Sequence, residues 1–263
     1  MATTTATRAE RDVLVSGLSV MLRESGEGEP LVVLHHSTGP LWTPFYDRLA
    51  GDFAVVAPDI PGFGKSARPT WARSPRDEAI LLHHLLDELG LDGVHLVGLG
   101  FGGWIAAEMA TMGHHRLKSL VLVGAAGLKP ERGDIHDPLL AGYEEYVRRG
   151  FCDDRAFEAV FGPEASAELI ELWDYSREMT ARLNWKPWMY SWELPNVLPG
   201  VRTPALVVWG RHDRVIPLVC GEQYAALLAN ARLEVVEGAG HIVDLEQADA
   251  LARLIVEFAH PTR

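Results

Sequence analysis

The segment 94–104 constrains the fold of this chain most, because a run of apolar residues passes through a glycine-rich turn directly into a helical pattern. Gly98, Gly100, Gly102 and Gly103 all stand in this segment. Glycine lacks a Cβ, so the backbone can turn sharply there and a helix can pack closely on the preceding strand. A buried strand that leads straight into a helix is typical of a parallel sheet covered on both faces. The segment therefore predicts an α/β fold.

The same alternation of short apolar runs and helical patterns extends along the chain. It predicts a mostly parallel, eight-stranded sheet flanked by helices. The expected strands are residues 13–15, 18–23, 31–34, 53–57, 95–99, 119–123, 205–209 and 233–236, and the expected helices are residues 43–49, 76–89, 101–112, 218–228 and 245–259.

Residues 127–200 differ in character from the rest of the chain. They show no convincing strand pattern, many charged residues and a cluster of tryptophans near their end. We interpret this stretch as a helical cap, inserted after the sixth strand and folded over the mouth of the sheet. Residues 1–126 and 201–263 then form the α/β core.

Composition narrows the classes of function. A length of 263 residues suits one large α/β domain. The net charge of −12 argues against a nucleic-acid-binding surface, which needs clustered Lys and Arg. The two cysteines are far apart and fit neither a disulfide framework nor a metal site. A polar N-terminus and the lack of a long apolar run predict a cytoplasmic monomer or homodimer that acts on a small molecule, without membrane contact, metal or cofactor.

The turn within 94–104 has the frame of the G-x-S-x-G nucleophile elbow, in which a serine occupies a strained turn between a strand and a helix. Gly98 and Gly102 hold the flanking positions, and Gly100 stands where the serine belongs. A glycine cannot form an acyl-enzyme, so covalent catalysis at this position is excluded. It also relieves a backbone strain that costs a residue with a side chain about 1–3 kcal/mol.

Further segments accompany the elbow along the chain. The expected strand 31–34 leads into the loop His35-His36-Ser37-Thr38-Gly39-Pro40, and Asp59-Ile60-Pro61-Gly62-Phe63-Gly64-Lys65-Ser66 follows the next strand as a rigid turn. Asp213 lies just past a strand end, and His241 lies in a glycine-lined loop after the last strand. Together these segments resemble the α/β-hydrolase superfamily, and especially lidded members such as C–C bond hydrolases, epoxide hydrolases and small esterases.

The resemblance covers nearly the whole chain and implies roles for individual residues. Asp213 corresponds to the triad acid and His241 to the general base. The backbone N–H groups of Ser37 and Phe101 correspond to the oxyanion hole. The oxyanion loop departs from the superfamily's pattern, because the usual His-Gly pair reads His35-His36 in this chain.

Three hypotheses account for Gly100. In the first, His241 and Asp213 activate a water that attacks an activated ester, lactone, epoxide or diketone directly. In the second, the chain is a non-catalytic ligand-binding member of the same fold. In the third, the glycine is an engineered replacement that inactivates a serine hydrolase. The presence of both Asp213 and His241 favours the first hypothesis, and the remaining frame predicts that Gly100→Ser gains burst-phase ester hydrolysis.

Several residues stay open between a functional and a structural role. His36 and Ser37 either shape the oxyanion loop or belong to the site, where Ser37 would position water or replace the nucleophile. Trp185 and Trp188 either line an apolar substrate pocket or attach the cap to the core. A dinucleotide-binding interpretation of residues 98–103 is disfavoured, because several strands precede this turn and no acidic residue ends the next strand.

Overall fold

The computed structural model describes residues 8–137, 142–185 and 187–260. Its strands are β1 (Ala9–Val15), β2 (Leu18–Ser25), β3 (Glu29–Leu34), β4 (Phe53–Pro58), β5 (Val94–Leu99), β6 (Leu117–Val123), β7 (Ala205–Gly210) and β8 (Ala231–Val236). They form one eight-stranded sheet in the order β1-β2-β4-β3-β5-β6-β7-β8. The pairs β1–β2 and β2–β4 are antiparallel, and the other pairs are parallel. The predicted mostly parallel sheet is confirmed.

The burial of a strand explains how easily that strand is predicted from the sequence. Every residue of β5 and β7 is buried, as in a sheet covered on both faces, so these strands read as continuous apolar runs. In contrast, residues 9–12 of the edge strand β1 are exposed and mostly charged. The strand expected over 13–15 therefore starts four residues later than the observed one.

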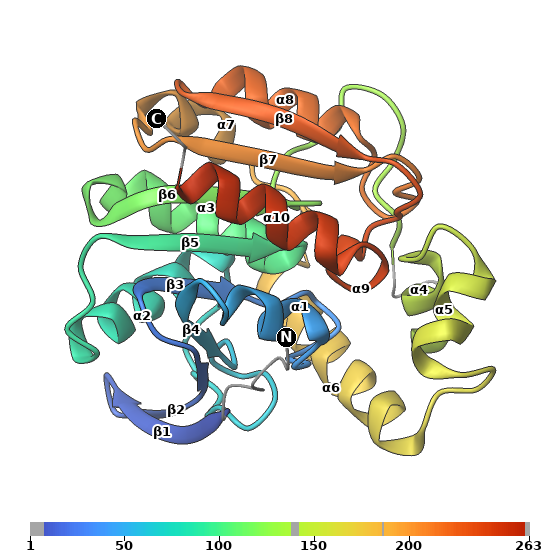
Figure 1. Cartoon of the computed structure of the whole chain (residues 1–263), viewed down its shortest axis with the longest axis horizontal. Helices are drawn as coiled ribbons and strands as arrows, with labels where there is room; N and C mark the ends of the chain where they lie inside the picture. The colour runs from blue at the N-terminus through green and yellow to red at the C-terminus, as the bar shows by residue number, and fades with distance from the viewer. Residues whose placement is uncertain (1–7, 138–141, 186, 261–263) are drawn as a thin grey trace.

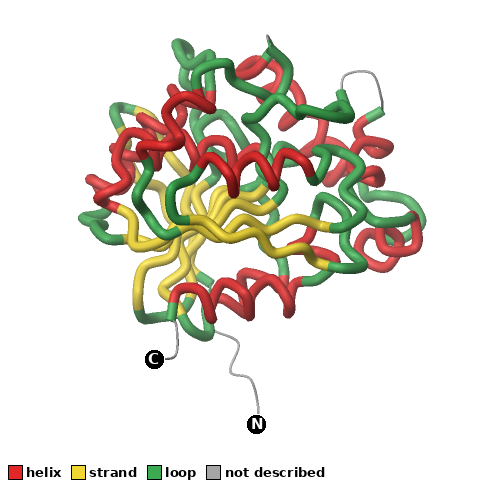
Figure 2. Tube along the Cα trace, turned by 90° about the horizontal axis from the view of Figure 1, so that it is seen from above, coloured by secondary structure: helices red, strands yellow, loops and turns green. Residues whose placement is uncertain are grey.

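Helices cover both faces of the sheet (Figures 1 and 2). On one face α1 and α10 pack together, with Phe45 and Leu251 in the core, and on the other face α2 and α3 pack together. The helix expected over 245–259 is in fact two helices, because Gln247 leaves the helical conformation with φ −132° and ψ 45°. The core helices are α1 (Pro44–Leu49), α2 (Pro75–Glu88), α3 (Phe101–Gly113), α8 (Val219–Leu227), α9 (Val243–Glu246) and α10 (Ala248–Ala259).

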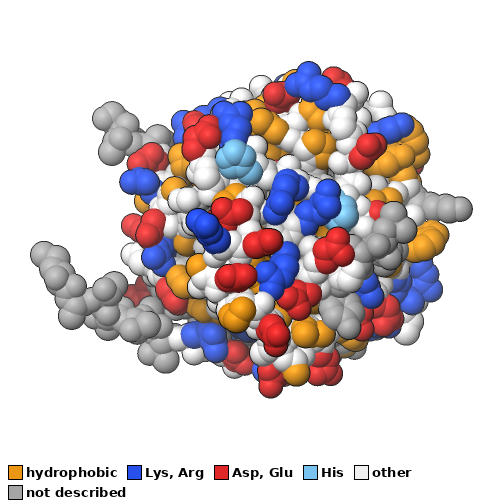
Figure 3. Space-filling view, turned by 90° about the vertical axis from the view of Figure 1, so that its right-hand side faces the viewer, with side chains coloured by type: hydrophobic (Ala, Val, Ile, Leu, Met, Phe, Trp, Pro, Cys, Tyr) orange, Lys and Arg blue, Asp and Glu red, His pale blue; other side chains and the backbone are white. Residues whose placement is uncertain are grey.

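The described chain between β6 and β7 is helical, as predicted for a cap inserted after the sixth strand. Its helices are α4 (Tyr143–Arg149), α5 (Asp154–Phe161), α6 (Ala167–Asn184) and α7 (Leu194–Val197). Figure 1 shows α4, α5 and α6 on the side to which the arrowheads of β5 and β7 point. Open α/β sheets bind ligands at this end. Viewed from that side, the visible surface carries intermixed charges of both signs (Figure 3). The exact cap limits, 127 and 200, stay a prediction.

Close packing around the elbow requires its flanking glycines. A Cβ on Gly98 would lie 2.5 Å from the carbonyl oxygen of Gly102. A Cβ on Gly102 would lie 2.5 Å from the carbonyl oxygen of Leu34. A side chain at either position would push α3 away from β3 and β5, so these two glycines set how closely the helix approaches the sheet.

Candidate active site

Gly100 forms the turn between β5 and α3, with φ +52° and ψ −110°. Residues with a side chain rarely adopt this backbone conformation, whereas glycine adopts it without steric cost. The N–H of Gly100 donates to the carbonyl of Val123 at 2.8 Å, and its own carbonyl accepts from the N–H groups of Gly103 and Ala126. The backbone of the elbow is therefore fixed, although residue 100 offers no nucleophile.

His241 and Asp213 form the pair that the resemblance implies. His241 Nδ1 lies 2.8 Å from Asp213 Oδ2, and both side chains are buried. Asp213 Oδ1 accepts from the N–H groups of Val215 and Ile216, each at 2.8 Å. Because Nδ1–H donates to the carboxylate, the lone pair of the neutral imidazole is on Nε2. His241 Nε2 lies 3.0 Å from the position that a Cβ on Gly100 would take, so this lone pair faces the elbow.

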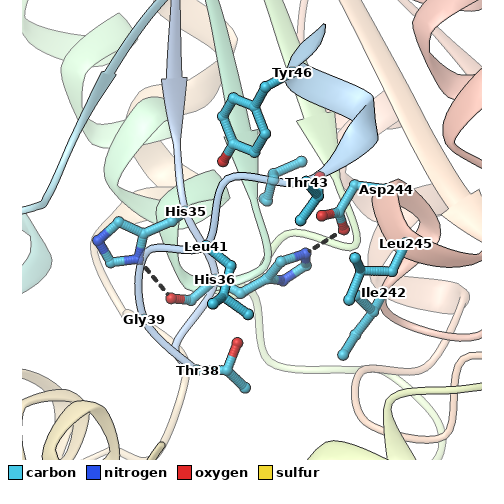
Figure 4. Close-up of a pocket in the computed structure, with 11 residues that line it drawn as sticks. His35, His36, Thr38, Gly39, Leu41, Thr43, Tyr46, Ile242, Asp244 and Leu245 are labelled. Atoms are coloured by element: carbon cyan, nitrogen blue, oxygen red, sulfur yellow. Dashed lines mark hydrogen bonds and ion pairs between the residues drawn. The ribbon is translucent and has the colours of Figure 1, made fainter. Parts of the chain in front are cut away.

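A second histidine–aspartate pair also reaches the elbow. His36 Nε2 lies 2.8 Å from Asp244 Oδ1, and both residues are buried (Figure 4). His36 Nδ1 lies 2.6 Å from the Cβ position of Gly100. The ring centroids of His36 and His241 are 5.4 Å apart. Two imidazole nitrogens therefore converge on the place where a nucleophile elbow holds its serine side chain.

Sequence reasoning left the role of His36 open and missed Asp244 entirely. The available signals were a histidine in place of the usual glycine of the oxyanion loop and an aspartate three residues after His241. In the structure, His36 Nδ1 is buried without a hydrogen-bond partner among the described residues. Buried polar atoms are normally paired with protein or ordered water. His36 Nδ1 can therefore hydrogen-bond to a water or a ligand at the elbow.

The expected oxyanion groups lie in the loop after β3 and at the start of α3. The carbonyl of His35 accepts from the N–H of Gly102 at 3.1 Å, which holds this loop against the elbow. Ser37 Oγ lies 2.8 Å from Tyr146 Oη of α4, so the hydroxyl is engaged by the cap. Phe101 is the first residue of α3, so its N–H has no acceptor within the helix. The side chain of Phe101 is fully buried in the core.

Two small cavities adjoin the converging imidazoles. One, of about 20 Å³, is lined by His36, Tyr46 and Asp244 among others. The other, of about 10 Å³, is lined by His36, Tyr146 and His241 among others. A single water needs about 10–15 Å³. Each of these two cavities is of the size that a single water occupies.

The chain can now be compared with known proteins. The model of a family described as "Alpha/beta hydrolase family" matches residues 31–254. The chain belongs to the alpha/beta hydrolase family. It is 32% identical to the 2-hydroxy-6-oxo-2,4-heptadienoate hydrolase of Pseudomonas putida, over 94% of this chain and 95% of that enzyme. It is 30% identical to a 2-hydroxymuconate semialdehyde hydrolase of Pseudomonas putida, over 94% of this chain and 93% of that enzyme.

Solved structures of other proteins share the alpha/beta hydrolase fold of this chain. The 2-hydroxy-6-oxo-6-phenylhexa-2,4-dienoate hydrolase of Rhodococcus sp. strain RHA1 matches with a TM-score of 0.76 at 24% identity, over 97% of this chain and 99% of that one. A membrane phospholipase A, a bacterial virulence factor, matches with a TM-score of 0.82 at 23% identity, over 95% of this chain and 85% of that one. These likenesses confirm the fold. The hydrolase names of the curated relatives agree with the predicted class of activity.

Serine at position 100 would fit this alpha/beta hydrolase only with a shift of the His36 ring, so the gain of ester hydrolysis by Gly100→Ser stays a prediction. A Cβ on Gly100 would lie 2.6 Å from His36 Nδ1, which is closer than real Cβ atoms approach a neighbour. His36 must therefore move before the elbow can hold a serine. In this chain the imidazole of His36 takes up the space that the serine side chain needs.

The two tryptophans predicted as pocket residues lie away from the elbow. Trp185 is 62% exposed. Trp188 is half-buried and lines a separate pocket of about 380 Å³ together with Lys129 and Tyr190. Neither tryptophan lines the cavities beside His36. The structure therefore brings Gly100, Asp213, His241, His36 and Ser37 together, and a substrate-binding role of the two tryptophans stays a prediction.

Donors for a metal are sparse in this site. Within residues 8–137, 142–185 and 187–260, no group of three or more His, Cys, Asp or Glu side chains is arranged to hold a metal ion. The elbow offers two imidazole nitrogens, whereas a catalytic zinc site takes three protein ligands. In the same described residues, no helix is long and apolar enough to cross a membrane.

Proposed function

We propose that this protein hydrolyses a small, partly apolar carbonyl compound by direct attack of water, without a covalent intermediate. The observation that carries the proposal is the position of His241 Nε2, 3.0 Å from where a Cβ on Gly100 would lie. Asp213 holds the other nitrogen of the same ring at 2.8 Å. A general base is therefore aimed at an elbow that has no nucleophile of its own.

Each bond change in the reaction can be assigned to a group of the site. His241 Nε2 accepts a proton from water while the water oxygen bonds to the carbonyl carbon. The carbonyl oxygen becomes an oxyanion, which the N–H groups of Phe101 and Ser37 stabilise. Collapse of the tetrahedral intermediate then breaks the bond to the leaving group. Asp213 stays ionised and stabilises the imidazolium that forms.

The strength of this catalysis limits the substrate. General-base assistance typically contributes about 10²–10⁴-fold, so the carbonyl carbon must already be electrophilic. The curated relatives are named as hydrolases of a 2-hydroxy-6-oxo-2,4-heptadienoate and of a semialdehyde. Both names describe a substrate that carries a carbonyl group. We therefore place activated esters, lactones and diketones first among the substrates, and epoxides second.

The placement of His36 bears on the other two hypotheses. An engineered loss of serine would change one residue, yet here the oxyanion loop also presents His36 at the elbow, paired with Asp244. A protein that only bound a ligand would need neither buried histidine–aspartate pair, and burying such pairs costs desolvation energy. Both observations support the hydrolase over an inactivated serine hydrolase and over a non-catalytic binding protein.

Steady-state hydrolysis by the purified chain tests the proposal. The panel holds p-nitrophenyl and ethyl esters with one acyl group, small lactones, epoxides and 2-hydroxy-6-oxo-2,4-heptadienoate. We expect turnover of at least one carbonyl substrate and a loss of about 10²–10⁴-fold in His241→Ala. The matched control is His115→Ala, which changes an exposed histidine just before the start of β6. The elbow lies at the other end of this strand, so the variant should keep full activity. Binding without product, or full activity of His241→Ala, would contradict the proposal.

A further inference from the structure

We infer that His36, held by Asp244, is the general acid that donates a proton to the leaving group while His241 acts as the base. The inference deepens the proposed function and rests on it. It assigns a catalytic role to a side chain that the α/β-hydrolase pattern does not contain at this position, where the usual residue is glycine.

The geometry places His36 against the reacting atoms. Its Nδ1 lies 2.6 Å from the Cβ position of Gly100, and His241 Nε2 lies 3.0 Å from the same point. Both nitrogens therefore reach the place where the carbonyl carbon of a bound substrate and the attacking water meet. A group at this distance can exchange a proton with the substrate directly.

The surroundings of the two aspartates separate the acid from the base. Asp213 accepts a hydrogen bond from His241 and two more from the N–H groups of Val215 and Ile216. Its carboxylate therefore has backbone donors in addition to the imidazole. Asp244 is buried, and His36 is the one donor to its carboxylate among the described residues. A buried carboxylate is costly unless it is paired. Asp244 therefore relies on His36 as its donor, whereas Asp213 has two backbone donors besides His241, and the acid role is assigned to His36 on this difference in geometry.

Other titratable groups around His36 stay uncharged near neutral pH. Burial lowers the pKa of His35 to about 3. Burial, and to a lesser degree the charge of Asp244, raises the pKa of Tyr46 in α1 well above its ordinary value. Burial raises the pKa of Tyr146 in α4 to about 12. Besides these residues, Asp244 and His241 lie next to His36.

The protons taken up and released balance over one catalytic turnover. Water gives one proton to His241 Nε2 and forms its bond to the carbonyl carbon. As the bond to the leaving group breaks, His36 Nδ1 gives its proton to the leaving atom. A water between the two rings then takes the proton from His241 Nε2 and gives one of its own to His36 Nδ1, since both nitrogens lie within 3.0 Å of the Cβ position of Gly100, and both starting forms are restored. No oxidant, reductant or further reactant is needed.

The role of His36 as general acid is tested by how the hydrolysis rate depends on the leaving group. A p-nitrophenolate leaves without a proton, whereas an alkoxide needs one. We expect His36→Gln to keep the rate on the p-nitrophenyl ester and to lose about 10²–10⁴-fold on the ethyl ester of the same acid. The variant His36→Gly, which introduces the superfamily's own residue, provides the same comparison if the glutamine disturbs folding, and thermal unfolding of each variant verifies the fold.

The pH profile gives a second readout that packing alone would not alter. In the unaltered chain, kcat/KM for the ethyl ester should follow a bell, because the base must be neutral and the acid protonated. His36→Gln should remove the alkaline limb. Equal losses on both esters with an unchanged profile would overturn the inference, as would an unaltered chain that never turns over the alkyl ester.

The same comparison distinguishes this inference from the proposed function. Loss of the base in His241→Ala should slow both esters, whereas loss of the acid should slow the alkyl ester selectively. If His241→Ala is fully active while His36→Gln is selectively impaired, the assignment of the base fails and that of the acid stands. If His241→Ala is inactive and His36→Gln slows neither ester, the proposed function stands and the acid fails.

Discussion

At the residue scale, two neighbouring positions have opposite departures from the α/β-hydrolase pattern. Position 100 has lost a side chain, and position 36 carries one where glycine is usual. In space the His36 ring lies within 2.6 Å of the point where the missing side chain would begin. The two departures therefore depend on each other sterically, and changing one alone is expected to be harmful.

A double substitution tests this dependence. Gly100→Ser alone should lower stability, because overpacking typically costs about 1–3 kcal/mol and the strained backbone adds a similar amount. Gly100→Ser combined with His36→Gly should recover part of that loss and should react with a fluorophosphonate probe, since His241 and Asp213 remain in place. Urea unfolding and probe labelling measure both effects. A stable, labelled Gly100→Ser single variant would show that His36 does not block the elbow.

At the element scale, the sequence predicted what local patterns determine. The buried strands β5 and β7 and the glycines of the elbow carry their own signals, and the chain order of Asp213 and His241 places both at strand ends. The pairing of His36 with Asp244 joins residues 208 positions apart, and Asp244 lies in the short helix α9 that no periodicity separates from α10. Such a contact depends on the packed loops, so residue patterns alone could not predict it.

Helix α2 carries a buried carboxyl group that should make the stability of the fold depend on pH. Glu78 is fully buried, and neither of its carboxyl oxygens has a partner among the described residues. Burial, and to a smaller extent Asp77, raises its pKa from 4.5 to about 8. The native state therefore keeps this proton after the unfolded state has released it. Stability should be unaffected by this group below pH 4.5, should fall as the pH rises towards 8, and should level off above that value.

Glu78→Gln removes this dependence. The variant should gain up to about 5 kcal/mol over the unaltered chain at pH 8 and little at pH 4. Urea unfolding at several pH values measures the difference. The matched control is Glu88→Gln, which changes an exposed carboxylate on the same helix. A gain that is independent of pH, or one shared by the control, would contradict a raised pKa of Glu78 in the native state.

At the scale of the whole molecule, the cap and the core enclose the site between them. Ser37 of the oxyanion loop and Tyr146 of α4 are hydrogen-bonded at 2.8 Å across this boundary. The cavities beside the imidazoles, about 20 and 10 Å³, match single waters rather than a substrate. The contact between Ser37 and Tyr146 therefore ties the cap to the oxyanion loop directly beside these cavities.

Direct attack by water is tested by the intact mass of the chain, quenched during steady-state turnover of a p-nitrophenyl ester. Because Gly100 provides no nucleophile and Ser37 Oγ is hydrogen-bonded to Tyr146, we predict that the mass stays that of the unmodified chain at every time point. The double variant Gly100→Ser with His36→Gly, quenched alongside, should gain the mass of the acyl group. An acyl adduct on the unaltered chain would contradict direct attack by water.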